Sequence, residues 1–217
     1  MPAGEGPHPV VVVIHGGYWQ ARYGKLIMRP VCSDLRRRGL AAWNVEYRRL
    51  GCDGGWPATF DDVAAAIDHL AEMNDPRLAL DSLAAIGHSA GGQLALWAAA
   101  RREARVPVTR VCGQAAVCDL TTAKAAHELL GGAPDEVPER FAKADPIQLV
   151  PLGVPILLVH GEADGTVPVK RSRRFAGAAR AAGDDVTLIE PNPADHRAHV
   201  DPRTKAWAIA ADWLASG

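Results

Sequence analysis

The sequence predicts an α/β fold with a mainly parallel central sheet and helices on both faces. Two continuous apolar runs, at 10–14 and 154–159, are rich in Val and Ile, as is typical of strands covered on both sides. Strand-like runs alternate with helix-like stretches along the chain, which favours right-handed crossovers between parallel strands. The 217 residues are 48% hydrophobic and 23% charged, so we expect a single domain over 1–217.

The first half of the chain follows this alternation. After the strand at 10–14, we expect a helix roughly over 23–38, in which Pro30 either delays the start or causes a kink. A strand at 40–45 leads into a glycine-rich loop at 46–56, and Thr59 is expected to cap the next helix. That helix carries Phe60, Val63, Ile67 and Leu70 at helical spacing.

The second half continues the pattern with one interruption. We expect the remaining regular elements as strands at 83–86, within 108–117, at 154–159 and at 186–190, and as helices at 93–100, 170–182 and 203–215. Residues 119–151 break the rhythm with several prolines and glycines, and we interpret them as a small cap over the sheet. Ligands on such sheets bind beyond the carboxyl ends of the strands.

Composition excludes several classes of partner. The formal net charge is −1 without a long basic run, so we expect no nucleic-acid binding. No apolar run approaches the roughly 20 residues that span a bilayer, so we expect no membrane segment. The first nine residues lack the basic start and apolar stretch of a signal peptide, and Cys32, Cys52, Cys112 and Cys118 lack metal-type spacing. We therefore expect a cytoplasmic protein with reduced cysteines and no metal or organic cofactor.

The segment Gly87-His88-Ser89-Ala90-Gly91 stands between a short apolar strand and a helical run. Strand, Gly-x-Ser-x-Gly and helix together indicate a nucleophile elbow, a sharp turn that lifts the serine hydroxyl clear of the sheet. The small glycines permit the strand end and helix start to approach closely. The alternative is a glycine-rich turn without chemistry.

Two further strand-end loops carry the acid and base that a serine nucleophile needs. The order Ser89, Asp164, His196 is the one expected for this strand–turn–helix type of hydrolase. His196 would take the proton of the Ser89 hydroxyl, and Asp164 would fix the tautomer of the imidazole.

Each assignment has rivals. For the base, His199 lies in the same loop as His196, while His160 could be an ordinary buried residue at a strand end. For the acid, Glu162 and Asp195 compete with Asp164, which we favour because a Gly-x-x-Asp-Gly turn would aim it at the site. A plain turn aspartate that bonds its own backbone is the alternative for Asp164.

The segment His15-Gly16-Gly17-Tyr18 follows the first strand, where an oxyanion donor normally lies. We assign the N–H groups of Gly17, Tyr18 and Ala90 to the oxyanion hole, since Ala90 follows the nucleophile. Trp19 and His88 are assigned to substrate binding, with simple core packing as the alternative for Trp19.

These motifs together resemble the α/β-hydrolase superfamily. His15-Gly16-Gly17-Tyr18-Trp19 with the elbow resembles esterases that carry an HGG oxyanion motif, and the HGGxW form is similar to kynurenine formamidase (arylformamidase) and its bacterial relatives. Residues 160–168 resemble the acid loop of the family. In residues 195–202 the resemblance selects His196 over His199, because the catalytic histidine of the family stands five residues before the aspartate of an Asp-Pro pair.

The resemblance implies an α/β-hydrolase fold and a serine hydrolase. We expect it to cleave a small carboxylic ester or aryl formamide through an acyl-enzyme, with 119–151 lining a substrate pocket. A prolyl-peptidase-like amide hydrolase and a catalytically silent small-ligand-binding protein are the alternatives. Family members usually have further strands before the HGG strand, so either the start is late or the sheet is trimmed. A trimmed sheet leaves an exposed edge, which makes a homodimer a reasonable expectation.

Overall fold

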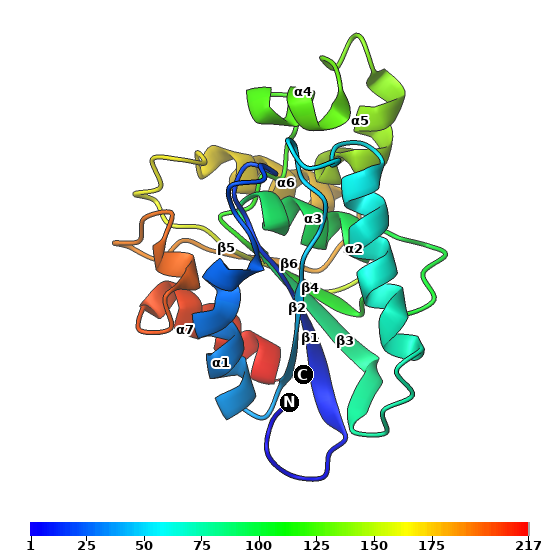
Figure 1. Cartoon of the computed structure of the whole chain (residues 1–217). Helices are drawn as coiled ribbons and strands as arrows, with labels where there is room; N and C mark the ends of the chain where they lie inside the picture. The colour runs from blue at the N-terminus through cyan, green and yellow to red at the C-terminus, as the bar shows by residue number, and fades with distance from the viewer. Residues whose placement is uncertain (217) are drawn as a thin grey trace.

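The computed structural model describes residues 1–216, which fold around one six-stranded sheet in the order β2-β1-β3-β4-β5-β6 (Figure 1). All neighbouring strands pair in parallel. The strands are β1 (His8–Ile14), β2 (Ala41–Val45), β3 (Leu78–His88), β4 (Arg110–Gln114), β5 (Ile156–Val159) and β6 (Val186–Ile189). The parallel sheet therefore agrees with the prediction from the sequence.

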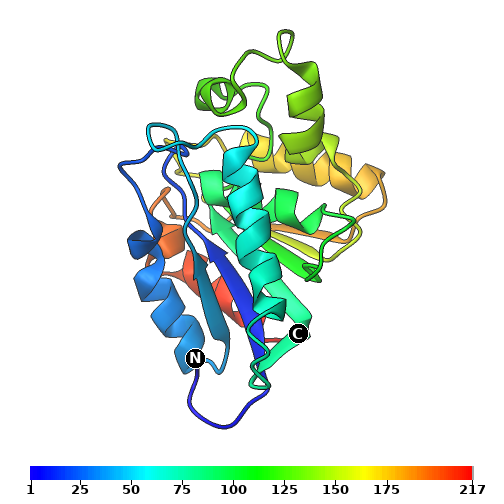
Figure 2. The same ribbon diagram turned by 45° about the vertical axis from the view of Figure 1, so that its right-hand side comes forward.

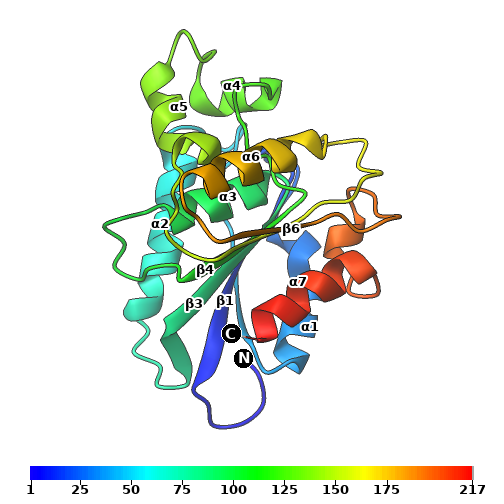
Figure 3. The same ribbon diagram turned by 180° about the vertical axis from the view of Figure 1, so that it is seen from behind.

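Helices cover both faces of this sheet (Figure 3). One face packs against α1 (Arg29–Arg37) and α7 (Lys205–Ala215), and the other against α2 (Ala58–Asp68), α3 (Ala90–Ala99) and α6 (Lys170–Ala181). Side chains of β1 alternate between the two cores, with Val12 and Ile14 in one and Val11 and Val13 in the other. A strand buried on both faces needs apolar residues at every position, which explains the continuous run at 10–14.

The segment between β4 and β5 lies above the carboxyl ends of the strands (Figure 2). It contains α4 (Lys124–Leu130), α5 (Pro138–Ala144) and a 3-10 turn, Pro146–Gln148. Two side chains of α3 form hydrogen bonds to this segment. Gln93 Nε2 donates to the Ala144 carbonyl at 2.9 Å, and Trp97 Nε1 donates to the Lys143 carbonyl at 3.1 Å. At its base, Asp145 is fully buried and accepts a hydrogen bond from a backbone N–H, while burial raises the pKa of its carboxyl to about 6.

The proline in the first helical stretch delays the helix. A 3-10 turn over Lys25–Met28 precedes α1, which begins at Arg29 with Pro30 in its first turn. An N–H group has no partner within the helix at that position, so proline is tolerated there.

The expected N-terminal cap of α2 was wrong. Pro57 is the residue before α2, and Thr59 lies inside the first turn. The Thr59 hydroxyl donates to the Arg48 carbonyl at 2.6 Å and accepts from the Gly55 N–H at 3.0 Å. Thr59 therefore ties the helix to the preceding loop. At α7, Thr204 is the N-cap.

The edge strands of the sheet are β2 and β6. The first strand of the chain, β1, is not at an edge, because it lies between β2 and β3.

The cysteines at 32, 52, 112 and 118 are free thiols. Across residues 1–216, no helix combines the length and apolar character that crossing a membrane requires. Three short 3-10 turns complete the described chain, at His69–Ala71, Pro146–Gln148 and Ala198–Val200, besides the one before α1.

Candidate active site

Ser89 occupies the sharp turn from β3 into α3, with φ +55° and ψ −118°. A non-glycine residue in this region costs about 1–3 kcal/mol and persists only where its surroundings enforce it. The flanking glycines provide the space: a Cβ on Gly87 would lie 2.0 Å from the Gly91 carbonyl oxygen, and one on Gly91 would lie 2.2 Å from the Ile14 oxygen. The sequence thus builds a strained elbow.

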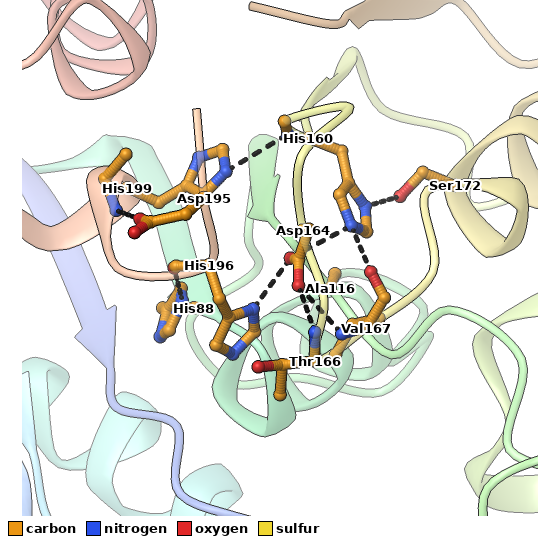
Figure 4. Close-up of polar contacts among 12 residues, drawn as sticks. His88, Ala116, His160, Asp164, Thr166, Val167, Ser172, Asp195, His196 and His199 are labelled. Carbon is orange, nitrogen blue, oxygen red and sulfur yellow. Dashed lines mark hydrogen bonds and ion pairs between the residues drawn. The ribbon is translucent and has the colours of Figure 1, made fainter. Parts of the chain in front are cut away.

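Asp164 and His196 come together from the loops after β5 and β6 (Figure 4). His196 Nδ1 donates to Asp164 Oδ2 at 2.7 Å. Because Nδ1 carries the proton of a neutral ring in this contact, Nε2 has a free lone pair. This is the tautomer that a general base beside a serine requires.

The Asp164 side chain is completely buried yet fully supplied with donors. Its Oδ1 accepts from the backbone N–H groups of Thr166 at 2.8 Å and Val167 at 2.9 Å. Its Oδ2 also lies 3.2 Å from His160 Nε2. Burial alone would raise the pKa of this carboxyl, but the histidine and backbone donors outweigh burial and hold the pKa far below its ordinary value. Asp164 is therefore a fixed anion.

Ser89 and His196 line the same cavity of about 490 Å³ beyond the carboxyl ends of the strands. Among residues 1–216, the Ser89 hydroxyl and the His196 ring are not joined by a hydrogen bond. Catalytic hydrogen bonds are often long without substrate and tighten in the complex. The described structure thus brings Ser89 and His196 to one cleft and joins His196 directly to the buried Asp164.

The loop after β1 presents backbone donors beside the elbow. The N–H groups of Gly17, Tyr18 and Ala90 donate to no other group in the described part of the chain. A Cβ on Gly16 would lie 2.6 Å from the His88 carbonyl oxygen and 3.0 Å from Ser89 Cβ, so the loop touches the elbow closely. Free N–H groups packed against a nucleophile are what an oxyanion hole needs.

This loop is under backbone strain that the sequence did not reveal. Tyr18 and Trp19 both have φ of +54°, and Gly17 has φ of +119°. Trp19 is 1% exposed, and its Nε1 donates to Gln93 Oε1 at 3.1 Å. Trp19 also lines a second cavity beside Ser89, so it serves both the core and the site.

A brace from the loop after β2 supports the loop after β1, which carries the proposed oxyanion donors, and no pattern in the sequence predicted it. Glu46 Oε1 lies 2.8 Å from His15 Nε2 and accepts from Arg49 Nη1 at 2.5 Å. The Tyr47 hydroxyl donates to the His15 carbonyl at 2.8 Å, and the Tyr47 and His15 rings stack with centroids 4.4 Å apart. Burial lowers the pKa of His15, while its contact with Glu46 opposes that effect.

His88 contacts the loop that carries the proposed base. Its Nε2 donates to the backbone carbonyl of His196 at 2.8 Å, and the two ring centroids lie 4.5 Å apart. Burial, then the nearby rings of His196 and His199, lowers the pKa of His88 to about 3. His88 is therefore a neutral donor. It lines the larger cavity, so substrate contact stays a prediction.

The rival acids and bases have other partners. His199 is buried, and its Nε2 accepts from the Gly161 N–H at 3.2 Å; burial lowers its pKa to about 4. Glu162 faces Arg173 at the surface, and Asp195 accepts N–H groups of its own turn. His160 is a fully buried residue at the end of β5, as expected, and it also links Asp164 to α6, because its Nδ1 lies 2.7 Å from Ser172 Oγ.

Two cavities meet at Ser89. The larger one contains Gly16, Gly17 and His196, and also Tyr23 and Ile27. The smaller cavity, about 250 Å³, reaches from Ser89 under the cap, and Trp19, Val117, Ala123 and Val167 are among its lining residues. No group of three or more His, Cys, Asp or Glu side chains within residues 1–216 has an arrangement that could hold a metal ion.

Comparison with solved structures identifies the architecture. A bifunctional GH43-CE protein of Bacteroides eggerthii superposes with a TM-score of 0.84 at 23% identity, covering 99% of this chain and 32% of that one. The esterase Est2 of Thermogutta terrifontis, bound to propionate, superposes with a TM-score of 0.81 at 22% identity, covering 98% and 84% of the two chains. The chain therefore has the α/β-hydrolase fold, as the sequence predicted.

Sequence comparison points to a narrower group. Esterase LipQ and Esterase LipC of Mycobacterium tuberculosis are each 28% identical over 88% of this chain. The chain spans about half the length of these relatives, 50% of LipQ and 53% of LipC. The BD-FAE family model matches residues 1–178, which include Ser89 and Asp164. An arylformamidase-like branch is not singled out by these matches. On the extent of the family match, this chain belongs to the BD-FAE family.

Proposed function

We propose that this chain is a serine esterase that cleaves a small carboxylic ester through an acyl-enzyme on Ser89. The observation that carries the proposal is the Asp164–His196 pair, 2.7 Å apart, beside a cavity that it shares with Ser89 at a strained elbow. The names of the relatives LipQ and LipC, both described as esterases, support the same reaction class.

The proposed mechanism follows from the positions of the donors. His196 Nε2 takes the Ser89 proton while Oγ attacks the ester carbonyl, and the new imidazolium is stabilised by the Asp164 anion. The carbonyl oxygen becomes an oxyanion beside the free N–H groups of Gly17, Tyr18 and Ala90. His196 then protonates the leaving alcohol. In the second half, His196 takes a proton from water, which attacks the acyl-enzyme carbonyl. The imidazolium then returns that proton to Ser89 Oγ as the ester bond to the serine breaks, which releases the acid and restores the hydroxyl.

This mechanism assigns the two cavities. The leaving group must lie near the His196 ring that protonates it, so the larger cavity, which contains His196, would receive the alcohol. The smaller cavity contains Ser89 and Ala90 and would receive the acyl group, so we name it the acyl cavity. At roughly 30 Å³ per water molecule, its volume of about 250 Å³ equals that of about eight waters.

An aryl formamide is the second candidate substrate. The aromatic side chains of Tyr18 and Tyr23 line the larger cavity and would suit an aromatic leaving group. A formyl group, however, has a single carbon and would leave the acyl cavity almost empty. The acyl cavity therefore favours an ester with a longer acyl group.

The test is the turnover of 4-nitrophenyl acetate and N-formylkynurenine by the wild type and by Ser89→Ala. Ser33→Ala, on α1 away from the cleft, is the matched control. We expect ester turnover that disappears only in Ser89→Ala, and a serine-directed organophosphonate adduct on Ser89 by mass spectrometry. Turnover that survives in Ser89→Ala would contradict the proposal and favour a silent binding protein. A preference for N-formylkynurenine would favour an arylformamidase. If prolyl amides, assayed alongside, were the only substrates cleaved, a prolyl-peptidase-like hydrolase would be favoured.

A further inference from the structure

The acyl cavity carries two cations and no anion. Lys124, at the start of α4, and Arg171, in the first turn of α6, are among its lining residues, and no Asp or Glu is. The rest of the lining near Ser89 is mostly apolar, including Trp19 and Val167. An acetyl group carries no charge and would need no cations, so an apolar cavity lined by two cations suggests a larger acyl group with a negative charge.

These cations lack carboxylate partners within residues 1–216, unlike their neighbours. On α6, Arg173 pairs with Glu190, and Arg174 pairs with Asp119 at 2.6 Å. Arg171, on the same helix, instead donates from Nη2 to the backbone carbonyl of Thr122 at 2.9 Å. This contact fixes the guanidinium beside the cavity without neutralising its charge.

The positive character is local, because the whole chain has a formal net charge of −1. Arg197 adds a cation to the lining of the larger cavity, where Asp and Glu are again absent. Unneutralised charges in a cleft with apolar walls raise the local concentration of ligands of opposite sign. A cleft with this lining would favour a ligand that carries negative charge.

We propose that the preferred acyl group ends in a carboxylate, so that the substrates are monoesters of dicarboxylic acids. The methylene chain would lie against the apolar wall of the acyl cavity, and the terminal carboxylate would meet Lys124 and Arg171. The volume of about 250 Å³, equal to that of about eight water molecules, suits an acyl group of roughly eight or nine heavy atoms. This inference rests on the proposed esterase function, because it needs the acyl group to be on that side of Ser89.

The experiment compares two substrates of equal chain length, the mono-4-nitrophenyl ester of adipic acid and 4-nitrophenyl hexanoate. Spontaneous hydrolysis is subtracted with Ser89→Ala. We expect kcat/KM about tenfold or more higher for the adipate ester at low ionic strength, mainly through a lower KM, because the carboxylate lies far from the reacting carbonyl. The preference should shrink in 0.5 M salt, where the screening length is only a few ångströms.

The variants Lys124→Met and Arg171→Gln test the two cations. Gln in place of Arg171 retains a side-chain amide donor for the Thr122 carbonyl. Each change should lower the preference for adipate by about threefold to tenfold and leave hexanoate turnover within about twofold. Lys170→Met, an exposed cation adjacent to Arg171 but outside the lining, should change neither.

The outcomes separate the two levels of the proposal. If neither ester is cleaved faster than by Ser89→Ala, the esterase function itself fails. If hexanoate is cleaved but adipate is not preferred, only the anionic-acyl inference is overturned. An equal effect of Lys170→Met would also overturn it, because the preference would then come from the general charge of the surface.

Discussion

The replacement Asp164→Asn separates the role of the carboxylate from its role in folding. The carboxylate accepts four contacts, from Thr166 N–H, Val167 N–H, His160 Nε2 and His196 Nδ1. An asparagine oxygen can still accept the two backbone N–H groups. Its NH₂ group, however, would face the two histidine nitrogens, and a donor there would force His196 into the tautomer with the proton on Nε2.

The expected loss is large because the wrong tautomer cannot accept the serine proton. In serine triads generally this substitution lowers kcat by about 10⁴, or about 5 kcal/mol. The effect on folding should be much smaller. His160 Nε2 retains the Val167 carbonyl as acceptor at 2.8 Å, so the cost is that of about one charge-assisted hydrogen bond, roughly 2 kcal/mol. For a chain of this size, that lowers the melting temperature by about 4–8 °C.

The assay is steady-state hydrolysis of 4-nitrophenyl acetate, with thermal unfolding of the same samples. Glu162→Gln is the matched control, because Glu162 is the exposed rival acid in the same loop and contacts Arg173 instead of a histidine. We expect a loss of kcat of about 10⁴ in Asp164→Asn and near-normal kcat in Glu162→Gln. Retention of more than a tenth of the activity in Asp164→Asn, with a folded protein, would refute the assignment of the acid.

Substitutions at three further positions test the residues beside the proposed triad, Gly16 and His88, and the base of the cap, Asp145. With the same ester, Gly16→Ala should reduce kcat about 10²–10³-fold with little change in KM. The reason is that the new Cβ would lie 2.6 Å from the His88 carbonyl oxygen and would displace the loop that carries the proposed oxyanion donors. His88→Ala removes the donor to the His196 carbonyl and should lower kcat about tenfold. His88→Gln, which keeps a side-chain donor, should recover most of the lost activity. Equal losses of activity in the two variants would indicate that His88 acts through packing alone. Asp145 has its pKa raised to about 6 from an ordinary 3.8, so its protonated form stabilises the fold, and this stabilisation is present below about pH 4 and lost as the pH rises to about 6. Denaturant unfolding between pH 4 and pH 7 should therefore show that the stability advantage of the wild type over Asp145→Asn falls by about 3 kcal/mol, and a difference between the two proteins that stays constant with pH would contradict this assignment.

The sheet was predictable because its signals are local. The run at 10–14 is apolar at every position since β1 contributes to both cores, and a short sequence window contains that information. The elbow was predictable for the same reason, because Gly87 and Gly91 are required by contacts with residues close to them or at the adjoining strand end. The proximity of Asp164 and His196 followed from strand ends meeting at one edge of a parallel sheet.

The missed features depend on contacts between distant segments. Thr59 has a suitable side chain for a cap, but its hydroxyl bonds the Arg48 carbonyl in the preceding loop. The brace of Glu46 and Tyr47 on His15 exists only because β1 and β2 are adjacent in the sheet, and no local pattern records it. The positive φ of Tyr18 contradicts local preference and is imposed by its surroundings.

The position of the cap between β4 and β5 separates two tasks within one chain. The proposed nucleophile, base and acid lie on loops at the ends of the sheet strands, whereas the cap contributes Lys124 and Ala123 to the wall of the proposed acyl cavity. Under the proposed function, lengthening or replacing the part of this insertion that lines the acyl cavity would alter which acyl groups fit, while Ser89, Asp164 and His196 would stay in place. If the cap is exchanged between related scaffolds, we therefore expect selectivity to change with the cap and the reaction to stay the same.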